Sequence, residues 1–367
     1  MSSRLQILVV DDTIVYRTIL KNAVSGIPGA EVVGVAPNGE IALDKIRQLN
    51  PNLVLMDVEM PHMDGLEALS RIRELHPGLG VVMISGTNRS SVDSTIRALE
   101  LGALDFVRKP DGDCPEENTE YIQRHLALIF AGYEPGLVRT PVTRRSGHVS
   151  GYRDKTSKVT SFEVPFGLVV IGCSTGGPTA LMELLPCLPA DFPTPILVVQ
   201  HMPSGFTESL ARSLDEKSPL NVREAVDGEV LTAGSIYMAP GGRHLMLSGK
   251  RTGPLVRFSA RLNDGPPVNN CKPSVDVLLQ SVRDEFKGRV LTVILTGMGS
   301  DGLNGVEALK EAGKCYCITQ SQSSCVVYGM PRAVEDAGLS DSSLPLEVIG
   351  VKISRMIEEG RPVNAAV

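Results

Sequence analysis

Acidic, hydroxyl and basic side chains follow short apolar runs at four points in the first third of the chain. In chain order they are Asp11, Asp12, Asp57, Ser85 and Lys109. Converging carboxylates repel one another, and a hard divalent cation with oxygen ligands relieves that repulsion. In phosphoryl transfer, Mg²⁺ and a lysine neutralise charge while a hydroxyl binds a phosphoryl oxygen. The set therefore suits phosphoryl transfer to an aspartate, although Asp11 or Asp12 alone could simply cap a helix that begins near Thr13.

A second set of chemical groups centres on Ser174. Residues 172–176 read Gly-Cys-Ser-Thr-Gly, the G-x-S-x-G spacing of a nucleophile elbow. The apolar run Val169–Ile171 precedes this string, and Pro178 marks the first turn of a helix. The glycines let the backbone turn sharply and expose the serine hydroxyl as a nucleophile. On this string alone two other interpretations carry similar weight: the turn binds a phosphate, or Ser174 is a plain helix N-cap.

A serine nucleophile needs a base and a third group that orients the base. Two histidines follow Ser174, namely His201 and His244. His201 ends the apolar run Ile196–Gln200, which puts it at the same sheet edge as the serine. His244 falls in a predicted hairpin, where we expect a structural or binding role. His201 is therefore the candidate base.

Asp301 is the candidate for the orienting acid. It lies in the loop that follows the apolar run Val290–Thr296, at a third strand end. The chain order Ser174, His201, Asp301 differs from the Ser-Asp-His order of α/β-hydrolases, so we expect a serine hydrolase of another topology.

The loop that carries Asp301 also matches a dinucleotide-binding fingerprint. Its glycines are Gly297, Gly299 and Gly302. A ribose-binding acid is expected about 20 residues further on, where this chain has Ser321 and Gln322. That difference disfavours a nucleotide cofactor.

The elements that must position these groups form two α/β domains. Residues 1–130 alternate β-branched runs with amphipathic stretches, which predicts a flavodoxin-like (βα)5 domain with a parallel sheet. Its expected strands are Gln6–Val10, Glu31–Ala36, Leu53–Met56, Val81–Ser85 and Asp105–Val107. Its expected helices are Val15–Val24, Gly39–Gln48, Gly65–Glu74, Ser91–Leu101 and Glu116–Phe130.

Beyond this domain, residues 131–165 are rich in proline, glycine, serine and basic residues and predict a linker. Residues 166–360 predict a second doubly wound, mostly parallel α/β domain. Its expected strands are Gly167–Gly172, Ile196–Gln200 and Val290–Thr296, together with a hairpin that pairs Ser235–Ala239 with His244–Ser248.

Composition restricts the classes of partner and the compartment. Lys plus Arg number 36 and Asp plus Glu 42, so the net charge of −6 disfavours a protein devoted to nucleic acid or anionic lipid. No apolar run reaches the roughly 20 residues that span a bilayer, and the first residues lack the features of a signal peptide. Seven scattered cysteines without a C-x-x-C pair indicate reduced, mostly buried thiols. We therefore expect a cytoplasmic protein without membrane insertion.

The first domain resembles a response-regulator receiver domain. The resemblance rests on Val9 through Asp12, Asp57 through Gly65, Ser85, and the pair Lys109-Pro110. It implies that Asp57 accepts a phosphoryl group from a histidine kinase of a chemotaxis pathway. It also implies that Mg²⁺ is held by Asp11, Asp12, Asp57 and the Glu59 carbonyl, and that Ser85 and Lys109 sense the phosphoryl group while Phe106 rearranges.

The second domain resembles the catalytic domain of chemotaxis protein-glutamate methylesterases. The resemblance rests on residues 171–177, 200–207, 295–302 and 324–331. It implies a triad of Ser174, His201 and Asp301, with the Met298 backbone N–H in the oxyanion hole. It further implies a phosphorylation-gated monomer that hydrolyses glutamate γ-methyl esters on chemoreceptors and deamidates certain receptor glutamines, with no cofactor for the esterase.

One position departs from that family pattern. Where many members have His-Arg-Pro-Ser-Val-Asp, residues 271–276 of this chain read Cys-Lys-Pro-Ser-Val-Asp. We expect Cys271 to lie outside the triad, where it could alter substrate contacts. The alternative function is a signalling module whose hydrolase-like domain only binds a partner, which the three occupied triad positions disfavour.

Overall fold

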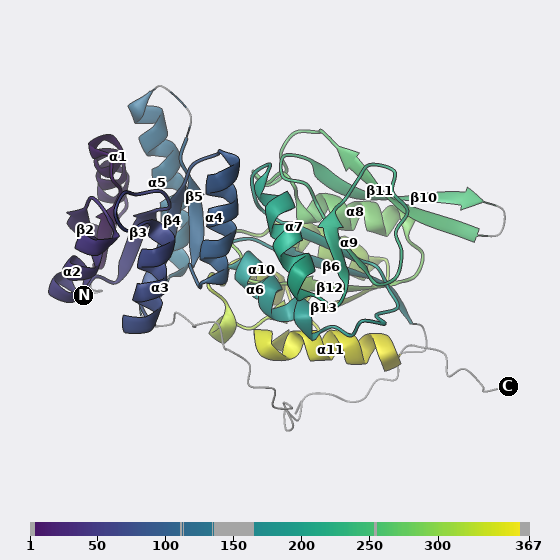
Figure 1. The fold of residues 1–367 in the computed structure, drawn as a ribbon. Coiled ribbons are helices and arrows are strands. Elements are labelled where there is room, and N and C mark those ends of the chain that lie inside the picture. Colours follow the sequence, from purple (N-terminus) through teal and green to yellow (C-terminus); the bar gives the residue numbers. More distant parts are fainter. Residues whose placement is uncertain are drawn as a thin grey trace.

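Figure 1 shows two α/β domains side by side in a computed structural model of the chain. The structure describes residues 4–133 apart from 111 and 113, residue 135, and residues 165–359 apart from 253 and 254. Most of the predicted linker, residues 131–165, lies outside the described residues, although its first two residues end a helix.

Over residues 4–132, five parallel strands alternate with five helices. The strands are β1 (Leu5–Val10), β2 (Ala30–Ala36), β3 (Leu53–Asp57), β4 (Gly80–Ser85) and β5 (Asp105–Arg108). The helices are α1 (Ile14–Ser25), α2 (Gly39–Leu49), α3 (Gly65–Leu75), α4 (Arg89–Glu100) and α5 (Pro115–Gly132). The order β2-β1-β3-β4-β5 is the flavodoxin-like one, and each predicted element is confirmed with its ends shifted by at most two residues.

Helices cover both faces of this sheet, which explains why its central strands are continuous apolar runs. Ile7 and Val9 of β1 pack in a cluster with α1 and α5, while the alternate residues Leu8 and Val10 pack in a cluster with α2, α3 and α4. With both faces covered, the carboxyl edge of the sheet is the place where polar side chains can gather.

Over residues 165–359, seven parallel strands form a sheet in the order β14-β13-β12-β6-β7-β9-β8. The strands are β6 (Phe166–Cys173), β7 (Ile196–Gln200), β8 (Asn221–Glu224), β9 (Ser235–Met238), β12 (Arg289–Ile294), β13 (Cys315–Gln320) and β14 (Ser342–Leu344). The helices are α6 (Gly177–Leu184), α7 (Phe206–Lys217), α8 (Val275–Glu285), α9 (Leu303–Glu311), α10 (Met330–Asp336) and α11 (Leu346–Glu359), with short 3-10 turns at Leu185–Cys187 and Gln322–Ser324. The predicted mostly parallel α/β architecture is confirmed.

The predicted hairpin between Ser235–Ala239 and His244–Ser248 is wrong. The first of these runs is β9, which is buried and pairs in parallel with β7 and β8. The second belongs to β10 (His244–Thr252), which pairs with β11 (Leu255–Asn263) in an antiparallel ribbon that projects from the domain in Figure 1. The local turn signal gave the wrong partner because a strand buried on both faces is paired by long-range packing.

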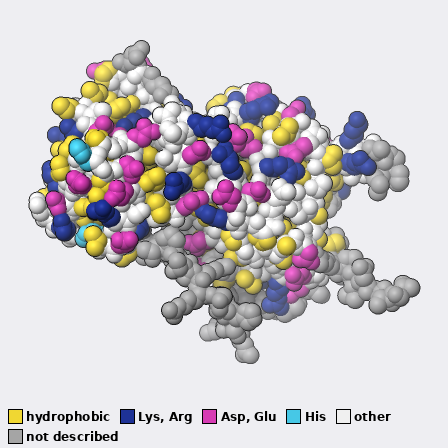
Figure 2. Space-filling model, viewed as in Figure 1, with side chains coloured by type: hydrophobic (Ala, Val, Ile, Leu, Met, Phe, Trp, Pro, Cys, Tyr) yellow, Lys and Arg dark blue, Asp and Glu magenta, His cyan; other side chains and the backbone are white. Residues whose placement is uncertain are grey.

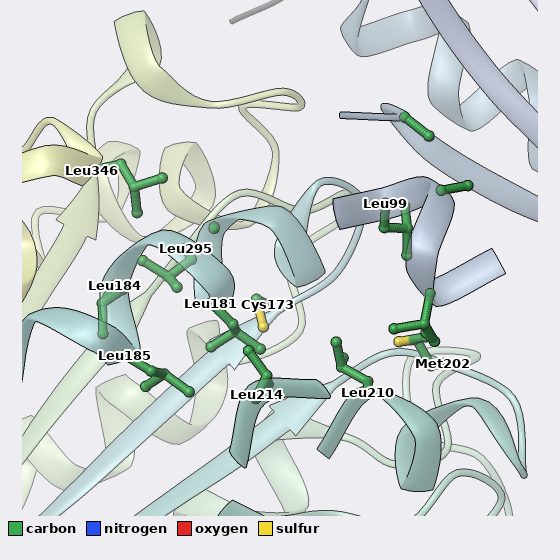
Figure 3. Close-up of a cluster of buried hydrophobic side chains, with 14 of the residues drawn as sticks. Leu99, Cys173, Leu181, Leu184, Leu185, Met202, Leu210, Leu214, Leu295 and Leu346 are labelled. Carbon is green, nitrogen blue, oxygen red and sulfur yellow. The ribbon is translucent and has the colours of Figure 1, made fainter. Parts of the chain in front are cut away.

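The two domains share a packed interface between α4 and α7. Leu99 of α4 belongs to the same buried cluster as Met202 and Leu210 of the second domain (Figure 3). Polar contacts flank this cluster: Ser209 Oγ donates to Asp93 at 2.6 Å, and Lys217 Nζ lies 2.6 Å from Glu100. Side chains of the two domains therefore form one continuous interior.

The visible surface in Figure 2 carries Lys, Arg, Asp and Glu side chains interspersed with one another. Among the described helices, none combines the length and the apolar character that a bilayer crossing requires. The described residues include all seven cysteines, and each is a free thiol. The expectation that they are mostly buried is wrong, since only Cys173 and Cys317 are fully buried.

Candidate functional site

Three carboxylates and a lysine meet at the carboxyl edge of the first sheet. Asp57 is the last residue of β3, Asp11 follows β1, and Lys109 follows β5. Lys109 Nζ lies 2.8 Å from Asp11 Oδ2 and 2.7 Å from Asp57 Oδ2. Asp11 and Asp57 are buried and Asp12 is exposed, and one oxygen of each lies within 4.8 Å of the others.

Burial sets the protonation behaviour of this acidic cluster. Loss of hydration raises the pKa of Asp57 to about 6, and the neighbouring Lys109 only partly opposes that rise. Burial alone would lower the pKa of Lys109, but the carboxylates of Asp57 and Asp11 raise it overall. A second cation with oxygen ligands would complete the charge balance, so the donor set fits Mg²⁺.

Neither Asp11 nor Asp12 caps a helix, so the simpler interpretation of that pair is wrong. Thr13 is the N-cap of α1, and its hydroxyl accepts from the Tyr16 backbone N–H. Asp11 instead accepts from the Thr13 backbone N–H at 2.9 Å and from its hydroxyl at 2.8 Å. The Asp11 carboxylate is thereby held facing the sheet edge.

The other site residues predicted in this domain contact α4 or the second domain. Ser85 is buried, and its hydroxyl accepts from Thr95 Oγ1 at 2.5 Å. The Glu59 carboxylate accepts from the Ser91 hydroxyl, also on α4. The Phe106 ring stacks on Phe206 of α7 with a centroid distance of 4.5 Å and an interplanar angle of 20°.

Ser174 lies in the turn between β6 and α6. Gly176, with φ of +74°, is the N-cap of α6, so Ser174 is not the N-cap. The Gly177 N–H donates to the Ser174 carbonyl at 2.7 Å, and Pro178 has no N–H. Two donors that a phosphate would use at this helix end are therefore unavailable, which disfavours the phosphate-binding interpretation.

Gln200, the last residue of β7, holds this turn in place. Its side-chain amide donates to the Ser174 carbonyl at 2.9 Å and its oxygen accepts from the Cys173 thiol at 3.0 Å. A Cβ on Gly177 would lie 2.0 Å from Gln200 Oε1, so a larger residue there would displace the Gln200 amide from this turn. Sequence reasoning missed this role; the buried amide at a strand end was the available signal.

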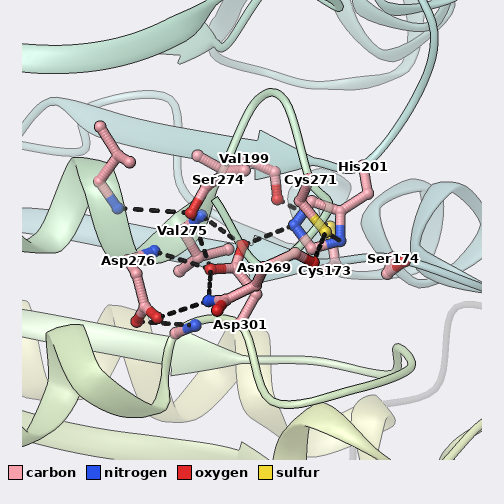
Figure 4. A network of polar contacts seen from close by, with 12 residues as sticks. Cys173, Ser174, Val199, His201, Asn269, Cys271, Ser274, Val275, Asp276 and Asp301 are labelled. Atoms are coloured by element: carbon pink, nitrogen blue, oxygen red, sulfur yellow. Dashed lines mark hydrogen bonds and ion pairs between the residues drawn. The ribbon is translucent and has the colours of Figure 1, made fainter. Parts of the chain in front are cut away.

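His201 and Asp301 form a direct pair at the same sheet edge. His201 Nε2 lies 2.8 Å from Asp301 Oδ2, and both residues are largely buried. Asp301 is fixed at the N-terminus of α8, where its carboxylate accepts from the Val275 N–H at 2.7 Å and from the Ser274 hydroxyl at 2.8 Å. Figure 4 shows this network with Ser174 beyond its His201 end.

The pairing with Asp301 determines which imidazole nitrogen can act as a base. In the neutral form of the ring, the bond to the Asp301 carboxylate places the proton on Nε2 and leaves the lone pair on Nδ1. The Cys271 sulfur lies 3.6 Å from this Nδ1. Within the described part of the chain the Ser174 hydroxyl makes no hydrogen bond. Cys271 therefore contacts the candidate base, a contact that the sequence did not predict.

The pKa of His201 predicts the pH dependence of catalysis. Burial disfavours the imidazolium, but the hydrogen bond to Asp301 and the contact with Cys271 outweigh it and raise the pKa to about 9. His201 is the candidate base and must be neutral to accept a proton, so kcat/KM for ester hydrolysis should rise about tenfold per pH unit and level off near pH 9. Cys271→Ala removes one of the contacts that raise the pKa of His201, so kcat/KM of this variant should level off at a lower pH.

A pH–rate profile of the wild type and Cys271→Ala measures this effect. Cys187→Ala is the matched control, because Cys187 is also a partly buried thiol but bonds to the Glu183 carbonyl. The control should keep the wild-type profile. Identical acid limbs in wild type and Cys271→Ala would contradict the assignment.

The loop after β12 lies against the serine. A Cβ on Gly297 would lie 2.8 Å from Ser174 Cβ, so the loop backbone and the candidate nucleophile are in contact. The Ser174 N–H donates to the Thr296 carbonyl at 3.0 Å. Further along this loop, the backbone N–H of Met298 donates no hydrogen bond within the described chain. This donor is therefore free for an oxyanion beside Ser174.

Asp276 occupies the position that a dinucleotide phosphate would need. Its carboxylate accepts from the N–H groups of Gly302 at 3.0 Å and Gly305 at 2.8 Å, at the start of α9. Asn269 links it to Asp301, the candidate orienting acid, since Asn269 Nδ2 donates to both Asp276 and Asp301. The backbone N–H at the end of the glycine fingerprint thus binds the protein's own Asp276 carboxylate. The sequence did not predict that Asn269 and Asp276 form hydrogen bonds around Asp301.

Comparisons with known proteins identify the families of the two domains. A family model described as CheB methylesterase matches residues 169–353, and one described as response regulator receiver domain matches residues 7–114. The chain is 43% identical to a protein-glutamate methylesterase/protein-glutamine glutaminase of Desulfotalea psychrophila, over 96% of this chain and 99% of that one. It is 41% identical to the protein of the same name in Trichodesmium erythraeum, again over 96% and 99%.

One solved structure is also similar to part of the chain. The crystal structure of the Thermotoga maritima CheB methylesterase catalytic domain is 44% identical, with a TM-score of 0.49, and the match covers 53% of this chain and 99% of that one. Near-full-length identity above 40% to curated relatives establishes the family. The chain belongs to the CheB methylesterase family and carries a response regulator receiver domain ahead of its methylesterase domain.

Proposed function

We propose that the chain is a phosphorylation-activated serine esterase that hydrolyses glutamate γ-methyl esters on chemoreceptors and deamidates receptor glutamines. The names of its relatives supply the substrate class. The observation that carries the proposal is the His201–Asp301 pair at the sheet edge beside Ser174. We assign the receiver to residues 1–130, the linker to 131–165 and the esterase to 166–360.

In the proposed reaction, His201 Nδ1 takes the hydroxyl proton as Ser174 Oγ attacks the ester carbonyl carbon. Negative charge develops on the former carbonyl oxygen, and the Met298 N–H donates to it. Collapse of the tetrahedral intermediate breaks the bond to methanol, which takes the proton from His201. Water then attacks the acyl-serine with His201 again as the base, releasing the free glutamate and restoring Ser174.

Asp301 stays ionised through both steps and stabilises the imidazolium. The hydrogen bonds that it receives from His201, Val275 and Ser274 outweigh burial and hold its pKa below the usual value. A primary amide passes through the same kind of tetrahedral oxyanion and releases ammonia in place of methanol. One site can therefore perform both reactions.

The receiver would control this site through the α4–α7 interface. Phosphorylation of Asp57 adds up to about two negative charges at the receiver's sheet edge. Mg²⁺ on Asp11, Asp12, Asp57 and the Glu59 carbonyl would neutralise charge on the transferred group. Ser85 and Lys109 are the phosphoryl contacts in this proposal.

Two contacts support a route from the receiver to the esterase. Phe106 stacks on Phe206, the first residue of α7, which begins shortly after His201. Met202, adjacent to His201, packs in the cluster that contains Leu99 of α4. A shift of Phe106 or α4 therefore acts on the segment that carries the base.

The implied partners are a chemotaxis histidine kinase and methylated receptors, with the esterase acting as a monomer. The free cysteines suit a reducing compartment, so we assign the chain to the cytoplasm.

Methanol release from receptor membranes that carry labelled methyl esters tests the function. We expect release with the full chain and faster release when a small-molecule phosphodonor and Mg²⁺ are added. A rate of methanol release that does not change with the phosphodonor would overturn the proposed activation by phosphorylation and leave the proposed esterase activity in place. No release in either condition would overturn the esterase.

A further inference from the structure

Cys271 and His201 place two metal-ligating atoms side by side in the candidate active site. Cys271 Sγ lies 3.6 Å from His201 Nδ1. Zinc bound by a thiolate at about 2.3 Å and an imidazole at about 2.0–2.1 Å, with a tetrahedral angle between them, separates the two atoms by about 3.5 Å. The pair is therefore already spaced to hold one tetrahedral ion with little movement.

The contacts of His201 leave its Nδ1 available for a metal. Nε2 is engaged by Asp301 at 2.8 Å, so the lone pair on Nδ1 points to the Cys271 side. A carboxylate that accepts the second N–H of a ligating histidine is the usual support of a zinc site, since it fixes the ring and raises its basicity. Asp301 is itself fixed by Val275 and Ser274, so the support is rigid.

Exposure and chemistry both favour a soft or borderline ion here. Cys271 is only partly buried and the His201 side chain is 11% exposed, so neither side chain is sealed from solvent. Among the described residues the only other hydrogen bond of Cys271 Sγ goes to the Asn269 carbonyl, at 3.4 Å, and a carboxylate oxygen of Asp301 lies within 4.8 Å of the pair. A thiolate and an imidazole select zinc over Mg²⁺, whereas the all-oxygen cluster at Asp57 suits Mg²⁺.

We propose that Cys271 and His201 form an inhibitory zinc site in the esterase domain, with solvent completing the tetrahedral coordination. Binding displaces the thiol proton to water and leaves the sulfur and Nδ1 on the metal. The ion then binds the Nδ1 lone pair that would accept the Ser174 proton, so bound zinc prevents His201 from acting as the base. The inhibition rests on the proposed role of His201 as the base, whereas zinc binding itself does not.

Cadmium and zinc titrations of the full-length protein, in excess Mg²⁺ to fill the receiver cluster, test the site. Cadmium should produce a thiolate charge-transfer band in the ultraviolet with one equivalent, and zinc should remove it by competition. The band should vanish in Cys271→Ser and in Cys271→Ala and persist in Cys187→Ser. A band that survives both substitutions at position 271 would overturn the site.

Activity measured on the same proteins separates binding from inhibition. The zinc concentration for half-inhibition, relative to each variant's own zinc-free rate, should rise at least about tenfold in Cys271→Ser, because even a supporting partner of a ligand is worth about 10–100-fold in metal affinity. Equal zinc sensitivity of wild type and Cys271→Ser would overturn the inhibitory role. If no variant hydrolyses esters, the proposed function has failed, and the cadmium band still decides the metal site.

Discussion

Ser174→Ala should lower kcat for methyl-ester hydrolysis by at least about 10⁴-fold, because it removes the proposed nucleophile and leaves only the binding and oxyanion contributions. KM should change little, since the serine hydroxyl gains its main interaction in the transition state. The fold should be unaffected, because within the described chain that hydroxyl makes no hydrogen bond that alanine would lose. Methanol release under saturating substrate measures the effect.

Ser354→Ala is the matched control. Ser354 lies on α11, where its hydroxyl donates to the Gly350 carbonyl at 3.0 Å, far along the chain from the candidate triad. We expect wild-type kcat from this variant and equal melting temperatures for both variants. Should Ser174→Ala retain even about a hundredth of the wild-type rate, Ser174 would not be the nucleophile.

The strand ends are the part of the site that the sequence predicts well. Runs such as Leu53–Asp57 and Ile196–Gln200 are fully buried between two helical layers, so their boundaries coincide with changes in side-chain polarity. Residues just after such runs must meet at one edge of a parallel sheet. This rule alone predicts that Asp11 lies near Asp57 and that His201 lies near the Ser174 turn.

Contacts between distant loops were beyond such reasoning. The spacing of Asn269, Asp276 and Asp301 carries no local signal, because their hydrogen bonds exist only once α8 and α9 are packed together. The pairing of β9 was mispredicted for a related reason: buried strands are paired by the whole sheet rather than by the adjacent turn. The contact of Cys271 with His201 likewise depends on how the loop before α8 folds back.

Asp57→Asn should abolish the response to a phosphodonor, so that the ratio of stimulated to basal methanol release falls to about one. Asparagine keeps the size of the side chain but cannot form the acyl phosphate, and it replaces one of the three carboxylates that fit Mg²⁺ by a neutral amide. Basal hydrolysis should remain, because Asp57 is in the receiver and the proposed triad is in the other domain. Incorporation of labelled phosphate, measured beside methanol release, should be lost in parallel.

Asp44→Asn is the control for this prediction. Asp44 is an exposed acid on α2 that pairs with Arg47, so the substitution removes the same charge at a surface position of the same domain. It should keep both phosphate incorporation and the activation ratio of the wild type. If Asp57→Asn still responded to the phosphodonor, the phosphoryl acceptor would have to be another residue. If it lost phosphate incorporation but kept the faster rate, activation would not pass through the receiver, and the contact of Phe106 with Phe206 would be structural only.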